Sequence, residues 1–168
     1  KMKFQSRNLD PFMVGLLHDL GIAIEHQFLF NDGFHLALSQ RFEKQSLLAD
    51  EERICMGVTH EEIGELVARK WNFPSHLVAV IGHHHRMESD HHEFADLLHV
   101  VRLAEYLSFK QQHGYCDFSE PYALTLKPSQ EALGISDDAL LLVSDQLARE
   151  MANLVNLGWF SELRIKLR

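Results

Sequence analysis

The chain has 168 residues, of which 46% are apolar, so it is long enough to bury a hydrophobic core and is not a disordered polypeptide. Its formal net charge of -8 argues against nonspecific nucleic-acid binding, which needs a cationic face. The longest apolar run on the predicted core helices, 77–81, is far shorter than the ~20 residues that span a bilayer, and no signal-peptide pattern precedes the first motif. Cys55 and Cys116 form no CxxC motif, which favours free thiols in a reducing cytoplasm.

Helix signals run through the first third of the chain. Asp10-Pro11 predicts an N-cap with proline at the first helical position, and the helix that follows is expected to hold the His18-Asp19 pair in its middle. The Asn31-Asp32-Gly33 segment is a turn signal. The next predicted helix has apolar residues at a four-residue spacing, namely Phe34, Leu38 and Phe42. A further helix is predicted over 47–56.

Helix start and stop signals continue to the end of the chain. Thr59 and Glu62 have the spacing of a capping box. The helix that they open has a predicted apolar stripe of Ile63, Leu66, Val67 and Trp71. Pro74 opens a helix with an i, i+3, i+4, i+7 stripe of Leu77, Val80, Ile81 and His84. A helix over 95–108, a loop over 114–128 and a helix from a Ser136 cap to Gly158 follow, so the predicted fold class is all-α.

Histidine and acidic residues recur on these helices at positions that could meet at one metal site. The six candidate ligands are His18, Asp19, His60, His84, His85 and Glu105. Imidazole binds Zn, Fe, Mn and Ni, and carboxylates add harder oxygen donors. His84 and His85 continue the apolar stripe, so both are expected inside, whereas His83 is expected at the surface. Glu105 lies on another apolar stripe and needs a metal, an arginine or a histidine as a partner, because an unpaired buried charge is costly.

Each segment taken alone has a plainer explanation. The His18-Asp19 pair is also compatible with two ordinary polar residues at a helix edge, and a lone histidine on an apolar face is commonly a hydrogen-bonded core residue. His60, in the first turn of its helix, could be a surface histidine near a cap. Gly64, on the same face, costs the helix roughly 1 kcal/mol relative to Ala. A glycine there is tolerated best where a neighbouring helix or a ligand comes close.

The segments together match a family pattern in their order and spacing. They are DPFMVGLLHDLG (10–21), ERICMGVTHEEIG (52–64), WNFP (71–74), LVAVIGHHH (77–85) and VVRLAE (100–105). From Asp10 to about Gly158 the chain resembles the HDOD domain, the HD-related output domain branch of the HD phosphohydrolase superfamily. The resemblance implies a bacterial signalling domain with an HD-type helical bundle, often joined to receiver or cyclic-dinucleotide modules.

The resemblance also shows departures from the catalytic HD enzymes. Those enzymes have an additional histidine about one helix upstream of the His-Asp pair, and this sequence starts too late to supply it. Ile22 stands where they often carry lysine, and Glu105 replaces a late aspartate ligand. The Gly-Tyr-Pro motif of the related cyclic-di-GMP phosphodiesterases is absent after His85. No catalytic residue is therefore assigned.

These features predict a single HDOD-like domain over residues 1–168 that lacks its N-terminal portion. The expected function is a non-catalytic, cytoplasmic regulatory output domain that binds a protein partner, an upstream domain of the same polypeptide, or a nucleotide or other phosphate-containing ligand, and neither nucleic acid nor membrane. The alternative is a metal-dependent phosphohydrolase or phosphodiesterase in which the six candidates hold one or two ions of Fe, Mn, Zn or Ni; a regulatory domain could also be metal-free. Five aromatic residues outside the clear helices are expected to pack over the bundle or to form a partner patch: Tyr115, Phe118, Tyr122, Trp159 and Phe160.

Overall fold

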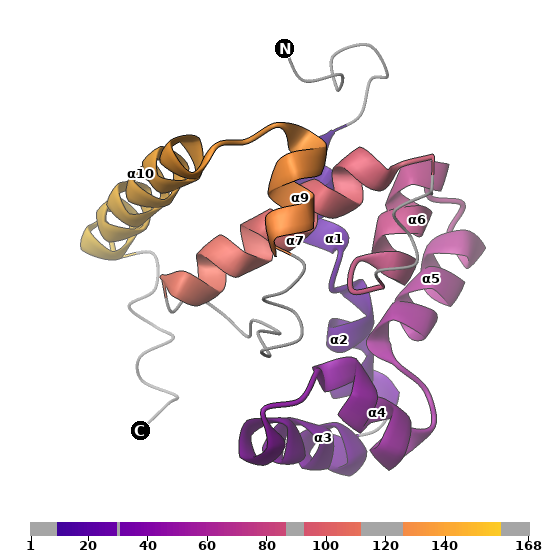
Figure 1. Cartoon of the computed structure of the whole chain (residues 1–168). Helices are drawn as coiled ribbons and strands as arrows, with labels where there is room; N and C mark the ends of the chain where they lie inside the picture. The colour runs from indigo at the N-terminus through magenta and orange to yellow at the C-terminus, as the bar shows by residue number, and fades with distance from the viewer. Residues whose placement is uncertain (1–9, 30, 87–92, 112–125, 159–168) are drawn as a thin grey trace. The chain divides into compact units, whose positions relative to one another are not determined.

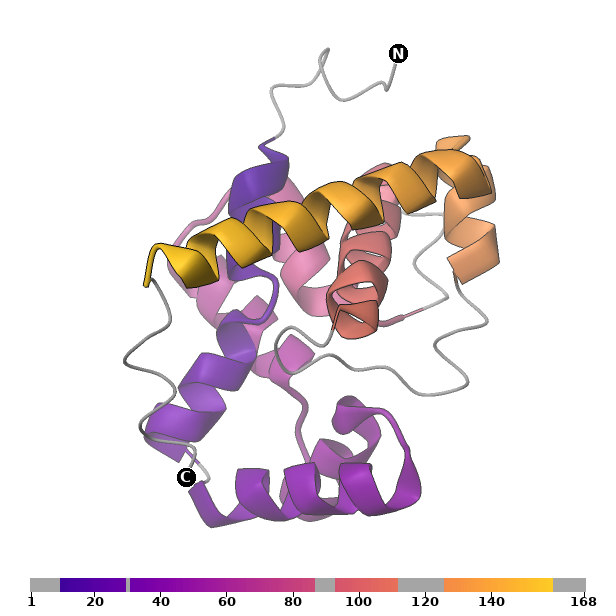
Figure 2. The same cartoon turned by 90° about the vertical axis from the view of Figure 1, so that its left-hand side faces the viewer.

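A computed structural model describes residues 10–29, 31–86, 93–111 and 126–158, and the regular elements in these ranges are all helical (Figures 1 and 2). The predicted all-α class is thereby confirmed. The chain forms two compact units, one ending at Leu133 and the other beginning at Gly134. Gly134 has a φ of 65°, a conformation that glycine adopts without a steric penalty. None of the described helices has the length and apolarity needed to cross a membrane.

Short helices build the first unit, and one long helix dominates the second. In chain order the first unit contains α1 (Pro11–Leu17), α2 (Leu20–Ile24), the π-helix η2 (Glu25–Leu29), α3 (Asn31–Lys44), α4 (Leu48–Met56), α5 (His60–Lys70), α6 (Ser75–His83), α7 (Ala95–Lys110) and α9 (Leu126–Leu133). The second unit contains α10 (Asp137–Asn156). In the first unit, α3 packs against α4, α5 against α6, and α7 against α9 (Figure 1).

The predicted N-caps are present. The Asp10 carboxylate accepts hydrogen bonds from the backbone N–H groups of Phe12 and Met13. Thr59 and Glu62 form both bonds of the capping box at the start of α5. These side chains satisfy backbone donors that have no partner within the first helical turn, so they fix where α1 and α5 begin.

Among the residues that the structure describes, buried apolar side chains form two separate clusters. The larger, called the main core below, comprises Val14, Ala68, Leu77, Val78, Ala79, Val80, Ile81, Phe94, Leu97, Leu98 and Val101. The smaller, called the minor core, comprises Phe34, Ala37 and Leu48, with Ile22, Leu38, Cys55 and Met56 partly buried against it. The main core joins α1, α5, α6 and α7, and the minor core joins α3 to α4. The predicted stripe along α6 is confirmed, because its apolar members are buried in the main core.

Two glycines allow α2 and α5 to pack closely. A Cβ atom on Gly21 would lie 1.8 Å from the carbonyl oxygen of His60, and one on Gly64 would lie 2.6 Å from Ile81 Cγ2. Both separations are shorter than real Cβ contacts, so the packing requires glycine at these positions. The close approach expected at Gly64 is therefore present, and it brings the start of α5 against α2.

The structure differs from the predictions for two segments, the turn at 31–33 and the loop over 114–128. Residues 31–33 begin α3 rather than form a turn. Asn and Asp favour helix N-termini as well as turns, and Asp32 lies in the first turn of α3, where the helix dipole favours a negative charge. The predicted loop over 114–128 is too long, because α9 begins at Leu126. Residues 114–125 and the five aromatic residues named above lie outside the described ranges.

The predicted inward faces of α3 and α5 were also partly wrong. Phe42, Leu66 and Trp71 are exposed, with relative accessibilities of 66%, 69% and 58%. The face that α5 buries consists of His60, Ile63, Gly64 and Ala68, which are spaced i, i+3, i+4 and i+8. Gly64 and Ala68 on this face let the neighbouring helices come close, and Leu66 and Trp71 lie off it.

Candidate metal centre

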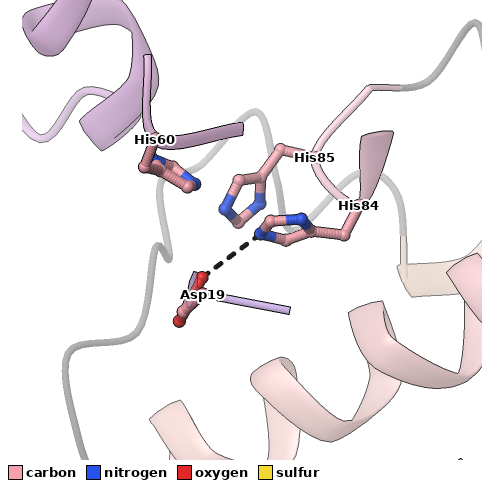
Figure 3. Close-up of side chains that lie close together, drawn as sticks. All are labelled: Asp19, His60, His84 and His85. Carbon is pink, nitrogen blue, oxygen red and sulfur yellow. Dashed lines mark ion pairs between the residues drawn. The ribbon is translucent and has the colours of Figure 1, made fainter. Parts of the chain in front are cut away.

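His18 and Asp19 lie at a break between two helices, not in the middle of one as predicted. His18 is the C-cap of α1, and Asp19, with φ −94° and ψ 23°, leaves the helical conformation and holds the N-cap position of α2 without a capping side-chain hydrogen bond. The carboxylate of Asp19 contacts two histidines. Its Oδ2 lies 3.2 Å from His18 Nε2, and its Oδ1 lies 3.3 Å from His84 Nε2 (Figure 3).

The remaining candidates come from α5, the end of α6 and α7. The ring centroid of His84 lies 4.1 Å from that of His85 and 5.5 Å from that of His60. Figure 3 shows these three rings and the Asp19 carboxylate directed toward one another. Glu105 Oε1 lies 3.6 Å from His18 Nε2 and 3.9 Å from His85 Nε2. The structure therefore brings all six sequence-predicted residues together.

The six side chains form two overlapping groups of potential ligands. One group is Asp19, His60, His84 and His85, and the other is His18, Asp19, His84 and Glu105. Within each group the candidate ligand atoms lie within 4.8 Å of one another, and Asp19 and His84 belong to both. Imidazole nitrogens combined with carboxylate oxygens suit zinc, iron or manganese. The residues thus fit one or two divalent transition-metal ions.

Hydrogen bonds determine which ring nitrogen three of the histidines turn toward the cluster. They join His18 Nδ1 to the Gly15 carbonyl oxygen (2.7 Å), His60 Nδ1 to Glu52 Oε2 (2.7 Å) and His84 Nδ1 to the Val80 carbonyl oxygen (3.1 Å). Carbonyl and carboxylate oxygens only accept hydrogen bonds, so each Nδ1 carries the proton and donates it. Each Nε2 is left for the cluster, which is the arrangement that metal-binding histidines adopt.

Burial and neighbouring charges shift the pKa values in the cluster. Burial by itself lowers the pKa of His18, but the hydrogen bond and charge of Asp19 and the charge of Glu105 outweigh it and raise that pKa to about 9. Burial raises the pKa of Asp19, but the adjacent His18 and His84 side chains hold it well below its ordinary value. Burial, with His84 and His60 nearby, lowers the pKa of His85 well below its ordinary value. At neutral pH Asp19 and His85 are therefore in metal-binding forms, whereas a metal must displace the proton of His18.

Three buried charged residues next to the cluster were missed from the sequence. Glu52 accepts the hydrogen bond from His60 described above. Glu61 accepts one from the backbone N–H of His85 at 3.2 Å, and Arg102 Nε donates to the carbonyl oxygen of His84 at 3.0 Å. The available signal was their position, because Glu61 adjoins His60 and Arg102 lies one helical turn before Glu105.

The neighbouring histidines of the triplet occupy different environments. His84 is fully buried, as predicted, whereas His83 is half-buried rather than largely exposed. His83 lines a pocket of about 450 Å³ together with Arg69, Asn72, Phe73, Ser75, Val78 and Ala79. This pocket shares no residue with the six-residue cluster.

Comparison with known protein families gives a match to this chain. A family model of the HDOD domain matches residues 2–87, about half of the chain. The matched segment contains every candidate ligand except Glu105. Neither the curated proteins nor the solved structures yield a match to the chain.

Proposed function

The chain belongs to the HDOD family of HD-related output domains, and on that premise we propose that it is a metal-binding regulatory module of a bacterial signalling protein. The observation that carries the proposal is the convergence of six nitrogen- and oxygen-donor side chains from separate helices on two overlapping ligand groups. The module acts by binding rather than by turnover. Its output passes to a protein partner or to an upstream domain of the same polypeptide, in the cytoplasm.

Metal binding would connect elements that are distant in the sequence. Asp19 lies between α1 and α2, His60 begins α5, and His84 ends α6. An ion held by these residues ties the helices together, and it stabilises the folded chain by mass action because the unfolded chain lacks the preformed site. Occupancy of the cluster could therefore change how the domain presents its surface to a partner.

The charges around the cluster favour binding over phosphoryl transfer. Ile22, which stands where related enzymes often carry lysine, packs against the minor core and offers no charge. Arg102 donates hydrogen bonds to the carbonyl oxygens of His84 and Arg86. Arg86 Nε in turn donates to Glu61 at 3.3 Å. Both arginines are engaged within the protein, whereas phosphoryl-transfer sites direct cationic side chains at the transferred group.

A metal-dependent phosphohydrolase is the second candidate, and one observation favours it. Asp19 and His84 belong to both ligand groups, as shared residues do in two-metal hydrolytic sites. The chemistry that bound metal supplies in such sites is water activation and neutralisation of phosphoryl oxygens. In this alternative the chain's own contribution is to hold the six donors, among them a half-buried, ionised Asp19.

A turnover assay separates the two candidates. Untagged protein loaded with Mn²⁺, Fe²⁺ or Zn²⁺ is assayed with bis(p-nitrophenyl) phosphate and with cyclic dinucleotides. We expect turnover far below ~1 s⁻¹, an ordinary enzymatic rate. Turnover above that rate that is lost in His18→Ala but kept in His35→Ala, which changes an exposed histidine of α3, would establish the phosphohydrolase instead.

A further inference from the structure

Glu52 makes an unusual double contact with one of the candidate ligands. Its Oε2 accepts hydrogen bonds from His60 Nδ1 at 2.7 Å and from the backbone N–H of His60 at 2.8 Å. Both side chains are fully buried, with relative accessibilities of 0%. A single carboxylate oxygen therefore holds both the ring and the main chain of His60, out of contact with solvent.

The position of His60 in its helix explains why it needs this carboxylate. His18 and His84 are C-caps, so carbonyl oxygens in the last turns of α1 and α6 accept their Nδ1–H groups. His60 is the first residue of α5, where the backbone presents unsatisfied N–H donors rather than acceptors. An acceptor for its ring must come from another element, and α4 supplies it as Glu52.

The contact controls which nitrogen of His60 is available to a metal. A carboxylate acceptor requires the proton on Nδ1 and leaves the Nε2 lone pair toward Asp19, His84 and His85. With Nε2 protonated instead, His60 could not be a ligand through that atom. The same hydrogen bond restricts rotation of the ring and makes Nε2 a stronger donor.

We infer that Glu52 is a positioning residue of the metal centre, which selects the Nδ1–H tautomer of His60 and fixes its Nε2 toward the metal. The inference rests on the proposed function for the metal itself, but the tautomer is a property of the metal-free protein. It assigns a role in the centre to α4, a helix that carries none of the six candidate ligands.

The adjacent residue provides a matched control. Glu51 is buried on the same helix but accepts hydrogen bonds from Lys44 Nζ and Ser46 Oγ, both at 2.7 Å, instead of from the cluster. Glu51→Leu and Glu52→Leu therefore remove the same carboxylate acceptor from neighbouring buried sites, whereas glutamine would keep an oxygen that accepts Nδ1–H. Glu52→Asp keeps the carboxylate on a shorter arm and is expected to show an intermediate effect.

The first measurement is long-range ¹H–¹⁵N correlation NMR of the histidine rings in metal-free protein. We expect wild type and Glu51→Leu to show His60 as the Nδ1–H tautomer, and Glu52→Leu to shift its population. An Nε2–H tautomer in wild type, or a tautomer unchanged by Glu52→Leu, would overturn the inference. The wild-type spectrum decides even if the Glu52 variants do not fold.

The second measurement is Zn²⁺ affinity by competition with a chelating dye, with folding checked by circular dichroism. Loss of an outer hydrogen-bond partner typically weakens metal binding by about 10–100-fold, so we expect a loss in that range for Glu52→Leu and less than about twofold for Glu51→Leu. Equal affinities of the two variants would overturn the inference. Absence of zinc binding in wild type would overturn the proposed function instead, a failure that the ring tautomer distinguishes.

Discussion

The main core and the minor core contribute to the candidate metal centre in different ways. Residues on or at the ends of α1, α5, α6 and α7, the helices of the main core, supply five candidate ligands: His18, His60, His84, His85 and Glu105. The minor core supplies no candidate ligand, but α4 beside it carries Glu52, which orients His60. The candidate donors therefore lie mainly where apolar packing is extensive, and a region with few buried apolar side chains contributes an orienting contact.

The junction between these regions is the packing of α2 against α5. α2 carries Ile22 into the minor core, and α5 carries Ala68 into the main core. Because Gly21 lies against the backbone of His60, the position of the α5 N-terminus depends on that contact. Disrupting the contact between Gly21 and His60 should therefore separate the contributions of the main core and the minor core.

The largest expected effect follows from filling this junction. Gly21→Ala places a methyl group where the His60 carbonyl oxygen lies 1.8 Å away, so α2 and α5 must move apart. We expect a loss of about 2–3 kcal/mol in the free energy of unfolding, at the upper end of ordinary overpacking. Urea denaturation followed by circular dichroism measures it.

Gly15→Ala is the matched control for that substitution. A Cβ on Gly15, in α1, would meet nothing within 4 Å, so the change should leave stability unchanged or raise it by up to about 1 kcal/mol through helix propensity. If the two alanine variants unfold at the same urea concentration, the close packing at Gly21 is not what joins the two regions.

A second effect should appear in the pH dependence of stability. Burial, then the nearby charge of Glu52, raises the pKa of Glu25 from 4.5 to about 8, with His60 opposing. The folded chain thus keeps a proton that the unfolded chain loses above pH 4.5. The resulting stabilisation is complete below that pH and is lost progressively as pH rises through about 8.

Glu25→Gln removes this titratable group and so tests whether Glu25 causes the pH dependence. In metal-free protein, the wild type should lose stability relative to Glu25→Gln between about pH 5 and pH 8, as followed by urea denaturation at several pH values. Parallel stability curves for the two proteins would show that Glu25 is not the group that retains the proton.

Much of the candidate site was predictable from local sequence. The capping box placed His60 at the start of a helix, and the stripe along α6 placed His84 inside, because each pattern involves residues within one or two helical turns. The helical break at His18-Asp19 was not predictable in the same way. Its neighbours Leu17 and Leu20 are good helix formers. The break places α2 in contact with α5, a tertiary packing that local propensity does not report.

The role of Glu52 and the inward face of α5 could not be predicted from the sequence, for related reasons. Glu52 belongs to the acidic and basic run 50–53, which is typical of a solvated helix face, and only the fold places its carboxylate beside His60. On α5 the large residues Leu66 and Trp71 dominated the apolar pattern, but close packing at Gly64 selects a face of smaller side chains. A lone sequence shows residue size but not how closely the neighbouring helix will approach.

The most direct test of the central claim is the metal content of untagged protein after incubation with Mn²⁺, Fe²⁺ or Zn²⁺ and desalting, measured by inductively coupled plasma mass spectrometry. Wild type and His83→Ala are predicted to retain at least one ion per chain. His84→Ala is predicted to lose it, because His84 belongs to both ligand groups and is fully buried. A wild type that retains no metal, or a His84→Ala variant that retains as much as His83→Ala, would contradict the assignment of the cluster as a metal centre.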